Sequence, residues 1–307
     1  MSELNLKKII ALGTIFSSFS PAVMALQDFS VSELSYQGAS RFSNEVSGES
    51  RLGYANGTFA INTSRNSIYI VGHSQHQAIA EYKLNGFSKD SNLENIPKAS
   101  PIMQGFTKIL NKTNDGNPEE IDTITGLQFI NNDLVVNAAT YYNASGSNKD
   151  STLIIRDPTN FSASLVDGYF ELTSSVHAAG WMTAIPEALR SEFEADYIFG
   201  FASNLPINSR NSMGPSAFAV DSSFVTRKEA GKEIQTTTLL DFSIENPLHP
   251  DLYNETGENQ LWTEISKAYV GFIVPGTRTY AVFGSSAGHQ FGIGYKIQQD
   301  DGNVCGG

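Results

Sequence analysis

One set of carboxylates in this chain has the residue types needed to hydrolyse a glycosidic bond. Asp157 follows a predicted strand, and four more acids crowd a loop upstream of it: Asp115, Glu119, Glu120 and Asp122. Glycoside hydrolysis uses two carboxylates that flank the scissile bond, about 5 to 9.5 Å apart. Asp157 and one of the loop acids would supply such a pair, whereas an Asp-Pro sequence after a strand is also typical of a plain turn.

Oxygen ligands for a cation gather at two places. Asp115 and Asn117 lie in the segment 114–122, and Asp300 and Asp301 lie near the C-terminus. Calcium prefers carboxylate and carbonyl oxygens carried on loops. Neither segment has the spacing of an EF-hand, so a solvated acidic turn is the alternative. The sequence therefore predicts no cofactor, and calcium is the cation that these segments could bind.

Two further patterns resemble catalytic or metal-binding motifs, but a structural role explains each of them better. Ser286 stands in Gly-Ser-Ser-Ala-Gly over 284–288, which matches a nucleophile elbow, a motif that needs a strand before it and a helix after it. Here a glycine-rich loop follows, so a hairpin loop is the better interpretation. His73 and His76 are three apart, and on a strand such positions point to opposite faces. We therefore expect them not to share a metal ion.

Aromatic side chains and long loops are the remaining candidates for a binding surface. A sugar could stack on exposed rings, although burial is the commoner fate of aromatic residues. Binding residues also concentrate on loops that a rigid scaffold holds in place. The aromatic candidates are Trp181, Trp262, Tyr141 and Tyr142, and the long loops are 111–121, 142–150 and 205–215.

The elements that must position these residues are predicted to be strands. Short runs rich in Val, Ile, Tyr and Phe are bounded by Asn, Gly, Asp or Pro, which is typical of strands joined by hairpins. A strand-turn-strand unit returns along the chain, and its aligned residues Phe59, Phe129, Phe199 and Phe272 are 70, 70 and 73 residues apart. The helix we predict covers 186–195 and starts at a proline.

Long-period repetition of strands is typical of repeat architectures such as the β-propeller. A small sheet cannot bury both of its faces alone, but sheets stacked around an axis can. We therefore predict an all-β, β-propeller-like fold with about four recognisable blades of about 70 residues, in a single domain over 26–307. A β-sandwich is the alternative, because it also contains many short strands.

The N-terminus has the pattern of a signal peptide over residues 1–25. Lys7 and Lys8 precede an apolar run, Ile9–Phe19, and the small residues of Val23–Ala25 suit a cleavage site. The run is shorter than the ~20 apolar residues that span a bilayer. We expect an exported protein, periplasmic or secreted, without a transmembrane segment after cleavage; a buried first strand or a short anchor is the alternative.

The charge of the chain excludes one class of partner, and its cysteine content bears on whether the C-terminus is complete. The net charge of −12 and the pI near 4.8 oppose nucleic-acid binding, which needs a basic surface. Cys305 is the single cysteine, and a lone cysteine in an exported protein suggests a missing partner. We expect a chain truncated at its C-terminus, with a native tail and a free thiol as the alternative.

Several short motifs follow one another along the chain: Gly72-His73, Ala80-Glu81, Tyr141–Gly146, Arg156-Asp157, Gly180–Pro186, Gly214–Phe218, Pro275–Arg278 and Val282–Gly284. Their order resembles that of a group of uncharacterised bacterial exported, β-propeller-like proteins. This resemblance covers most of residues 50–307. It implies a partial propeller whose relatives continue with a second Cys and further blades, and it implies no catalytic residue, because the group has no assigned activity. The Arg156-Asp157-Pro158 triplet also resembles that of five-bladed propeller glycosidases, whose Asn-Asp-Pro-Asn-Gly motif is missing here.

Two classes of function remain open from the residues. The first is a binding protein that holds a protein partner or a glycan through its long loops. The alternative is a carbohydrate-active hydrolase or lyase, in which Asp157 and one of the acids of 115–122 would converge in a central pocket.

Overall fold

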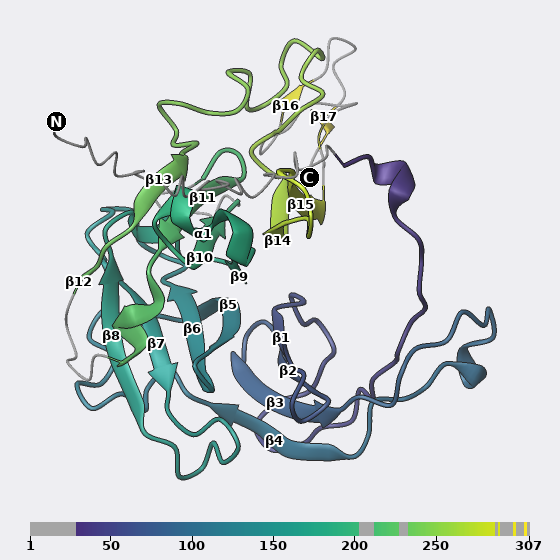
Figure 1. Cartoon of the computed structure of the whole chain (residues 1–307). Coiled ribbons are helices and arrows are strands. Elements are labelled where there is room, and N and C mark those ends of the chain that lie inside the picture. The colour runs from purple at the N-terminus through teal and green to yellow at the C-terminus, as the bar shows by residue number, and fades with distance from the viewer. Residues whose placement is uncertain are drawn as a thin grey trace, which may run out of the picture.

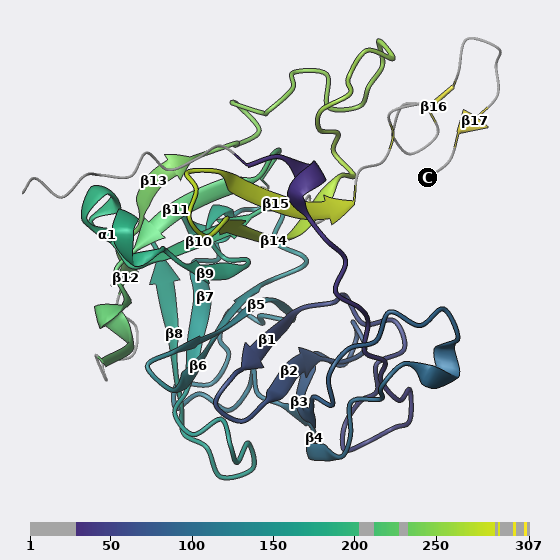
Figure 2. The same ribbon diagram turned by 45° about the vertical axis from the view of Figure 1, so that its right-hand side comes forward.

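The protein is described from a computed structural model over residues 29–202, 212–226, 233–285, 288, 297–298 and 304–305. It is mostly β, with several antiparallel sheets, none of which closes on itself. Figure 1 shows the sheets following one another in chain order, and Figure 2 shows the same succession from a second side. The predicted signal peptide, residues 1–25, lies outside the described residues.

The first two sheets are four-stranded antiparallel meanders, and a short parallel strand extends the second. Asn131 and Asn132 have φ of 51° and 69°, the left-handed conformation that a two-residue hairpin requires, and they join β5 to β6. Sheet 1 contains β1 (Phe59–Asn62), β2 (Ser67–Val71), β3 (Ala78–Lys83) and β4 (Ile102–Lys108). Sheet 2 contains β5 (Thr123–Ile130), β6 (Asp133–Ala139), β7 (Asp150–Ile155), β8 (Val166–Leu172) and the parallel strand β12 (Glu233–Ile234).

The third sheet is again a four-stranded antiparallel meander, and the described part of the chain ends in two strand pairs. Sheet 3 contains β9 (Met182–Ala184), β10 (Tyr197–Phe201), β11 (Ser216–Val220) and β13 (Thr237–Leu240). Sheet 4 pairs β14 (Lys267–Ile273) with β15 (Tyr280–Ser285), and β16 (Ile297–Gln298) pairs with β17 (Val304–Cys305).

The helices are short, and all but the first of them lie between strands. The helix α1 (Glu187–Phe193) follows Pro186 directly, so the predicted helix is confirmed with slightly tighter limits. The described residues also form the 3₁₀ turns η1 (Val31–Glu33), η2 (Leu93–Asn95), η3 (Ser175–His177) and η4 (Ser222–Thr226). No helix of the described residues is long and apolar enough to cross a membrane.

The core lies between successive sheets. Sheet 2 buries one face against sheet 1 and the other against sheet 3. Leu134 and Val136 of β6 share a core cluster with Tyr69 of sheet 1. Val135, which lies between them in β6, shares a second cluster with Phe199 and Phe218 of sheet 3. Neighbouring residues of a strand point to opposite faces, and β6 is buried without a break from Leu134 to Ala139, Asn137 included. Contacts between sheets also join β1 to β5, β5 to β9, and β9 to β14.

The predicted repeat needs correction in its third unit. Phe59, Phe129 and Phe272 lie in the first strands of their sheets, but Phe199 lies in β10, the second strand of sheet 3. The first strand, β9, covers three residues and was not predicted. Because the unit was aligned one strand too late, the regular spacing of the phenylalanines does not measure the spacing of the sheets.

Candidate functional site

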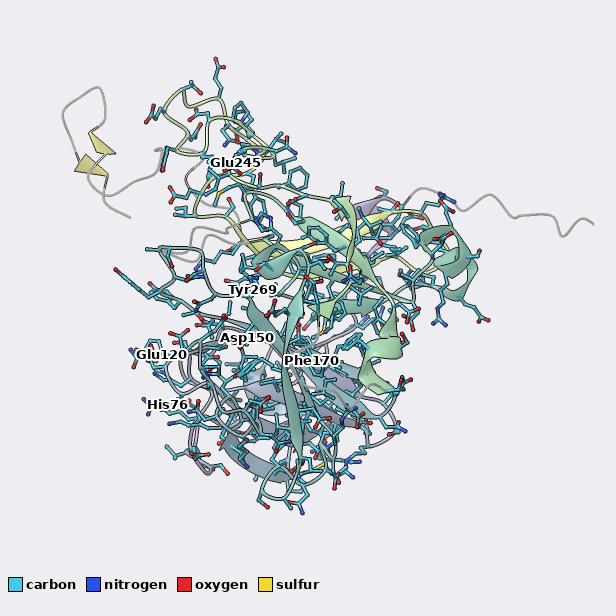
Figure 3. All side chains as sticks on the ribbon, turned by 90° about the vertical axis from the view of Figure 1, so that its left-hand side faces the viewer. His76, Glu120, Asp150, Phe170, Glu245 and Tyr269 are labelled. Carbon is cyan, nitrogen blue, oxygen red and sulfur yellow. The ribbon has the colours of Figure 1, made fainter. Side chains whose placement is uncertain are left out.

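A polar hollow opens where sheet 1 meets sheet 2, and we call it the loop cleft. Its cavity volume is about 350 Å³, within the range of ligand sites. One wall is the turn between β2 and β3 with the end of β4, and the other is the loop that leads into β5. Figure 3 shows His76 and Glu120 near each other at one edge of the molecule. The cleft is lined by Gln75, His76, Gln77, Lys108, Leu110, Asn111, Asn117, Glu120, Ile121 and Asp122.

Two side-chain amides hold the walls of the loop cleft in place. The Gln77 Oε1 accepts a hydrogen bond of 2.7 Å from the Ile124 N–H, which joins the β2–β3 turn to β5. The Asn117 Oδ1 accepts from the Ile121 N–H at 2.8 Å. Its Nδ2 donates to the Ile121 carbonyl at 2.9 Å and to the Asn111 Oδ1 at 3.0 Å. These amides are therefore used to shape the cleft.

Other groups that line the loop cleft remain available to a ligand. Glu120 is exposed, and its backbone has φ of 53°, a left-handed conformation that is uncommon for such a residue and occurs often at functional sites. Within the described ranges, the Glu120 carboxylate and the Lys108 ammonium have no hydrogen-bond or ion-pair partner. The cleft therefore presents an acceptor and a donor that bear opposite charges.

Aromatic rings form a row that ends in the loop cleft. The rings of His73 and His76 stack with centroids 4.6 Å apart, and the Tyr54 ring meets His73 edge-on at 5.6 Å. Tyr54 is 81% exposed. The Ser50 hydroxyl lies 3.1 Å from the His76 Nδ1, which fixes the ring beside the cleft.

The stacked histidines correct the prediction that they point to opposite faces. His73 and His76 lie in the tight turn between β2 and β3, where the backbone N–H groups of His76 and Gln77 both donate to the His73 carbonyl. A turn does not alternate its side chains as a strand does. In the described parts of the chain, no group of three or more His, Cys, Asp or Glu side chains gathers to hold a metal ion.

The structure separates Asp157 from Glu119, one of the four acids proposed to pair with it. The Glu119 Oε2 accepts from the Lys149 and Asp150 N–H groups at 2.7 and 2.8 Å, at the beginning of β7. Asp157 lies beyond the other end of this strand. With a rise of about 3.4 Å per residue, the six residues of β7 alone separate the two ends by about 17 Å. This separation exceeds the reach of a glycosidase carboxylate pair.

The local hydrogen bonds of Asp157 are those of a turn residue. Its Oδ1 accepts from the Thr159 N–H at 3.1 Å and from the Thr159 hydroxyl at 2.6 Å. The next carbonyl, that of Pro158, accepts from the Tyr69 hydroxyl and the Gln104 amide of sheet 1. Asp157 is exposed, so its turn fastens sheet 2 to sheet 1 rather than lining a pocket.

The remaining candidates lie in different surroundings. Asp115 is exposed at a turn closed by the Gly116 N–H and the Thr113 carbonyl. The Asp122 Oδ1 accepts from the Tyr141 N–H at 2.9 Å. Asp300, Asp301 and Ser286 lie outside the described residues.

The aromatic candidates divide into buried and exposed rings. Trp181 is 4% exposed, and its Nε1–H donates to the Tyr280 hydroxyl at 2.8 Å. Tyr141 and Tyr142 are 45% and 67% exposed. The hydrogen bond from the Tyr141 N–H to the Asp122 carboxylate places them next to the lining of the loop cleft. Trp262 is half-buried. Exposure therefore leaves the two tyrosines as candidates for stacking.

Three acidic residues, Asp150, Glu171 and Glu119, lie close together beside the loop that leads into β5. Asp150 of β7 and Glu171 of β8 are opposite each other in the strand register. Burial raises the pKa of the Asp150 carboxyl to about 6, and the nearby charges of Glu119 and Glu171 add to this rise. Glu119 directly precedes Glu120 in the loop that leads into β5. When Asp150 ionises, its charge therefore repels the carboxylate next to Glu120 in the chain.

Sequence reasoning missed His76 and Lys108 as members of this site. The polar run His-Ser-Gln-His-Gln over 73–77 separates two apolar strands, and that pattern indicates a turn in which both histidines face one side. Lys108 gave no local signal, since it ends a strand of a neighbouring sheet. Comparison with protein-family models, with curated proteins and with solved structures finds no match to this chain.

Proposed function

We propose that this protein is an exported β-propeller-like binding protein that holds a glycan in the loop cleft. The observation that carries the proposal is a polar cavity of about 350 Å³ with unpaired charged groups and exposed aromatic rings at its side. Sugar hydroxyls both donate and accept hydrogen bonds, so Glu120 and Lys108 suit them together. Sugar ring faces are apolar, and Tyr141, Tyr142 and Tyr54 offer surfaces for them.

The propeller assignment is supported by the order of the sheets. Each sheet is a meander or hairpin, and the first strands of successive sheets contact one another from β1 through β5 and β9 to β14. A propeller brings the first strand of each blade to its axis in this way. Burial of both faces of sheet 2 against its two neighbours agrees with the same arrangement.

Binding is favoured over hydrolysis by the positions of the carboxylates. Asp157 and Glu119 are at opposite ends of β7, and Asp157 is engaged in its own turn. Glu120 and Asp122 both line the cleft, but the Asp122 carboxylate accepts from a backbone N–H and from the Thr123 hydroxyl at 2.9 Å. A carboxylate held by two donors is suited to orienting a loop. Export and a bacterial origin rest on the N-terminal pattern and on the motif order in the sequence.

The test compares glycan binding by the full chain and two variants. A glycan array identifies the oligosaccharide that binds, and titration calorimetry then measures its affinity. Glu120→Gln removes a charged acceptor, and hydrogen bonds to charged groups contribute about 1.5 to 3 kcal/mol, so we expect affinity to fall about tenfold or more. Tyr142→Ala removes a stacking surface and is expected to weaken binding as well.

The matched control is Glu194→Gln. Glu194 has φ of 51° and is exposed, like Glu120, but it lies at the end of α1. We expect this variant to bind as the wild type does. Binding of no glycan on the array, or equal losses in the Glu120 and Glu194 variants, would contradict the proposal. Capture of a protein ligand that depends on Glu120 would favour a protein partner instead.

A further inference from the structure

A second cavity, unrelated to the loop cleft, lies between α1, sheet 3 and sheet 4. Its volume is about 140 Å³. Its lining is apolar and includes Leu189 and Phe193 of α1, Ile198 of β10, Ala217 of β11 and Ile273 of β14. These residues belong to, or pack against, one core cluster. The cavity thus lies at the edge of this core cluster, where it is partly open beside Leu240 and Arg278.

The size and lining of this cavity match a single aromatic ring. Side chains normally fill a protein interior to the density of an organic crystal, with few voids larger than water. A cavity of about 150 Å³ lined by Leu, Ile and Phe stays dry and binds benzene in a known engineered case. Leu240, at 42% exposure, also lines the cavity, so an apolar molecule can enter past a surface side chain.

The charged group beside the cavity is already paired, so the ligand is expected to be uncharged. The Arg278 guanidinium forms an ion pair with the Glu192 carboxylate of α1. The Tyr280 hydroxyl accepts from the Trp181 indole at 2.8 Å, while Tyr280 also lines the cavity. A charged ligand would enter an apolar space without an unpaired opposite charge, which is costly. We infer that this cavity binds a small uncharged aromatic molecule.

The test uses benzene and phenol as probes with the full chain, and benzoate as the charged comparison. Methyl NMR is recorded during titration, and the methyl signals of Leu189, Ile198 and Ile273 are expected to shift in a saturable way with benzene. Signals of Leu127 and Leu134, in the cluster between sheets 1 and 2, are expected to stay unchanged. Benzoate is expected to bind at least tenfold more weakly than benzene.

Two variants separate binding in the cavity from a general effect on the fold. Ala217→Val fills part of the cavity from inside, and Leu240→Trp covers it from the surface. Each is expected to weaken benzene binding at least tenfold. The control is Leu165→Trp, since Leu165 is 67% exposed and does not line the cavity; this variant is expected to bind benzene as the wild type does.

The outcomes are distinct. Saturable methyl shifts that both cavity variants suppress support the inference. If Ala217→Val does not fold, Leu240→Trp alone decides, because it replaces an exposed side chain. No saturable shift, equal binding by the Leu240 variant, or tighter binding of benzoate than of benzene would overturn it.

Discussion

The Asp150 carboxyl is a place where the fold brings like charges together. It lies opposite Glu171 in the register of β7 and β8, and like charges directly opposite on two strands are destabilising. Burial is the largest cause of its raised pKa, about 6, and the charges of Glu119 and Glu171 act in the same direction. The folded protein therefore holds a proton on Asp150 more tightly than the unfolded chain does.

We predict that Asp150→Asn changes the pH dependence of stability. An acid whose pKa rises on folding stabilises the fold below its unfolded pKa of 3.8, and that contribution is lost as pH rises through about 6. At pH 7.5 the variant should be more stable than wild type by about 1 kcal/mol, after allowance for solvent screening of a partly exposed group. At pH 4 the two should differ little. Urea unfolding at both values measures this.

Asp115→Asn is the control, since Asp115 is exposed in its turn and faces no such cluster. Its stability relative to wild type should be the same at both pH values. If Asp150→Asn gives the same difference at pH 4 as at pH 7.5, the neutral amide acts through packing and not through lost charge.

Among the elements, the turn between β2 and β3 matters because it joins two sheets. Gln77 is 7% exposed, and its backbone has φ of 50°. Its side-chain Oε1 accepts a hydrogen bond of 2.7 Å from the buried Ile124 N–H. The same turn carries His76 to the loop cleft. One side chain thus connects the packing of sheets 1 and 2 to the shape of the candidate site.

Gln77→Ala should destabilise the protein and weaken ligand binding together. It leaves the Ile124 N–H buried without its acceptor, and an unsatisfied buried group costs about 1 to 3 kcal/mol. Gln75→Ala, two residues earlier in the same turn at an exposed position, should change stability by less than about 0.5 kcal/mol. Chemical denaturation of both variants provides the comparison. Equal stability of the two would show that the turn does not depend on this bond.

How far the sequence predicts these elements depends on where each strand lies. The sequence predicts the buried runs 67–72, 134–139 and 151–155, which correspond to β2, β6 and β7, because burial on both faces favours runs that are mostly apolar. β4 has an irregular mixture of buried and exposed residues, and β9 covers three residues, so neither has a clear periodic signal. Phe199 was assigned to the wrong strand of its sheet for the same reason: strand order depends on contacts between distant segments.

The candidate site shows the same division between local and tertiary information. The loop 115–122 was a candidate from its acids alone, and Asn117, Glu120 and Asp122 do line a cleft. The opposite wall comes from the β2–β3 turn and from Lys108, which only the packing of sheets 1 and 2 brings near. The pairing proposed for Asp157 could not be tested by spacing, because it depends on which end of β7 each acid occupies.

For the whole molecule, the succession of sheets predicts that stability is shared between neighbours. Where repeated units contact only adjacent ones, stability is approximately a sum of the terms for each unit and each interface. The inner edges approach closely: a Cβ added to Gly126 would lie 1.8 Å from the Gly180 carbonyl oxygen. Sheet 2 is covered on both faces, whereas β15 is exposed or half-buried along its described length.

Sheet 4 should therefore open before sheet 2, and Tyr280→Phe should enlarge the difference. The variant removes the acceptor of the buried Trp181 indole N–H, which is a contact between sheets 3 and 4 and not within either. In native-state hydrogen exchange, amides of β14 and β15 should exchange faster in the variant, while those of β6 and β7 should keep their wild-type rates. Tyr253→Phe, at a residue 45% exposed, is the matched control and should change neither group. Equal acceleration in sheets 2 and 4 would mean that the sheets unfold as one cooperative unit, which would contradict the neighbour-by-neighbour account of this fold.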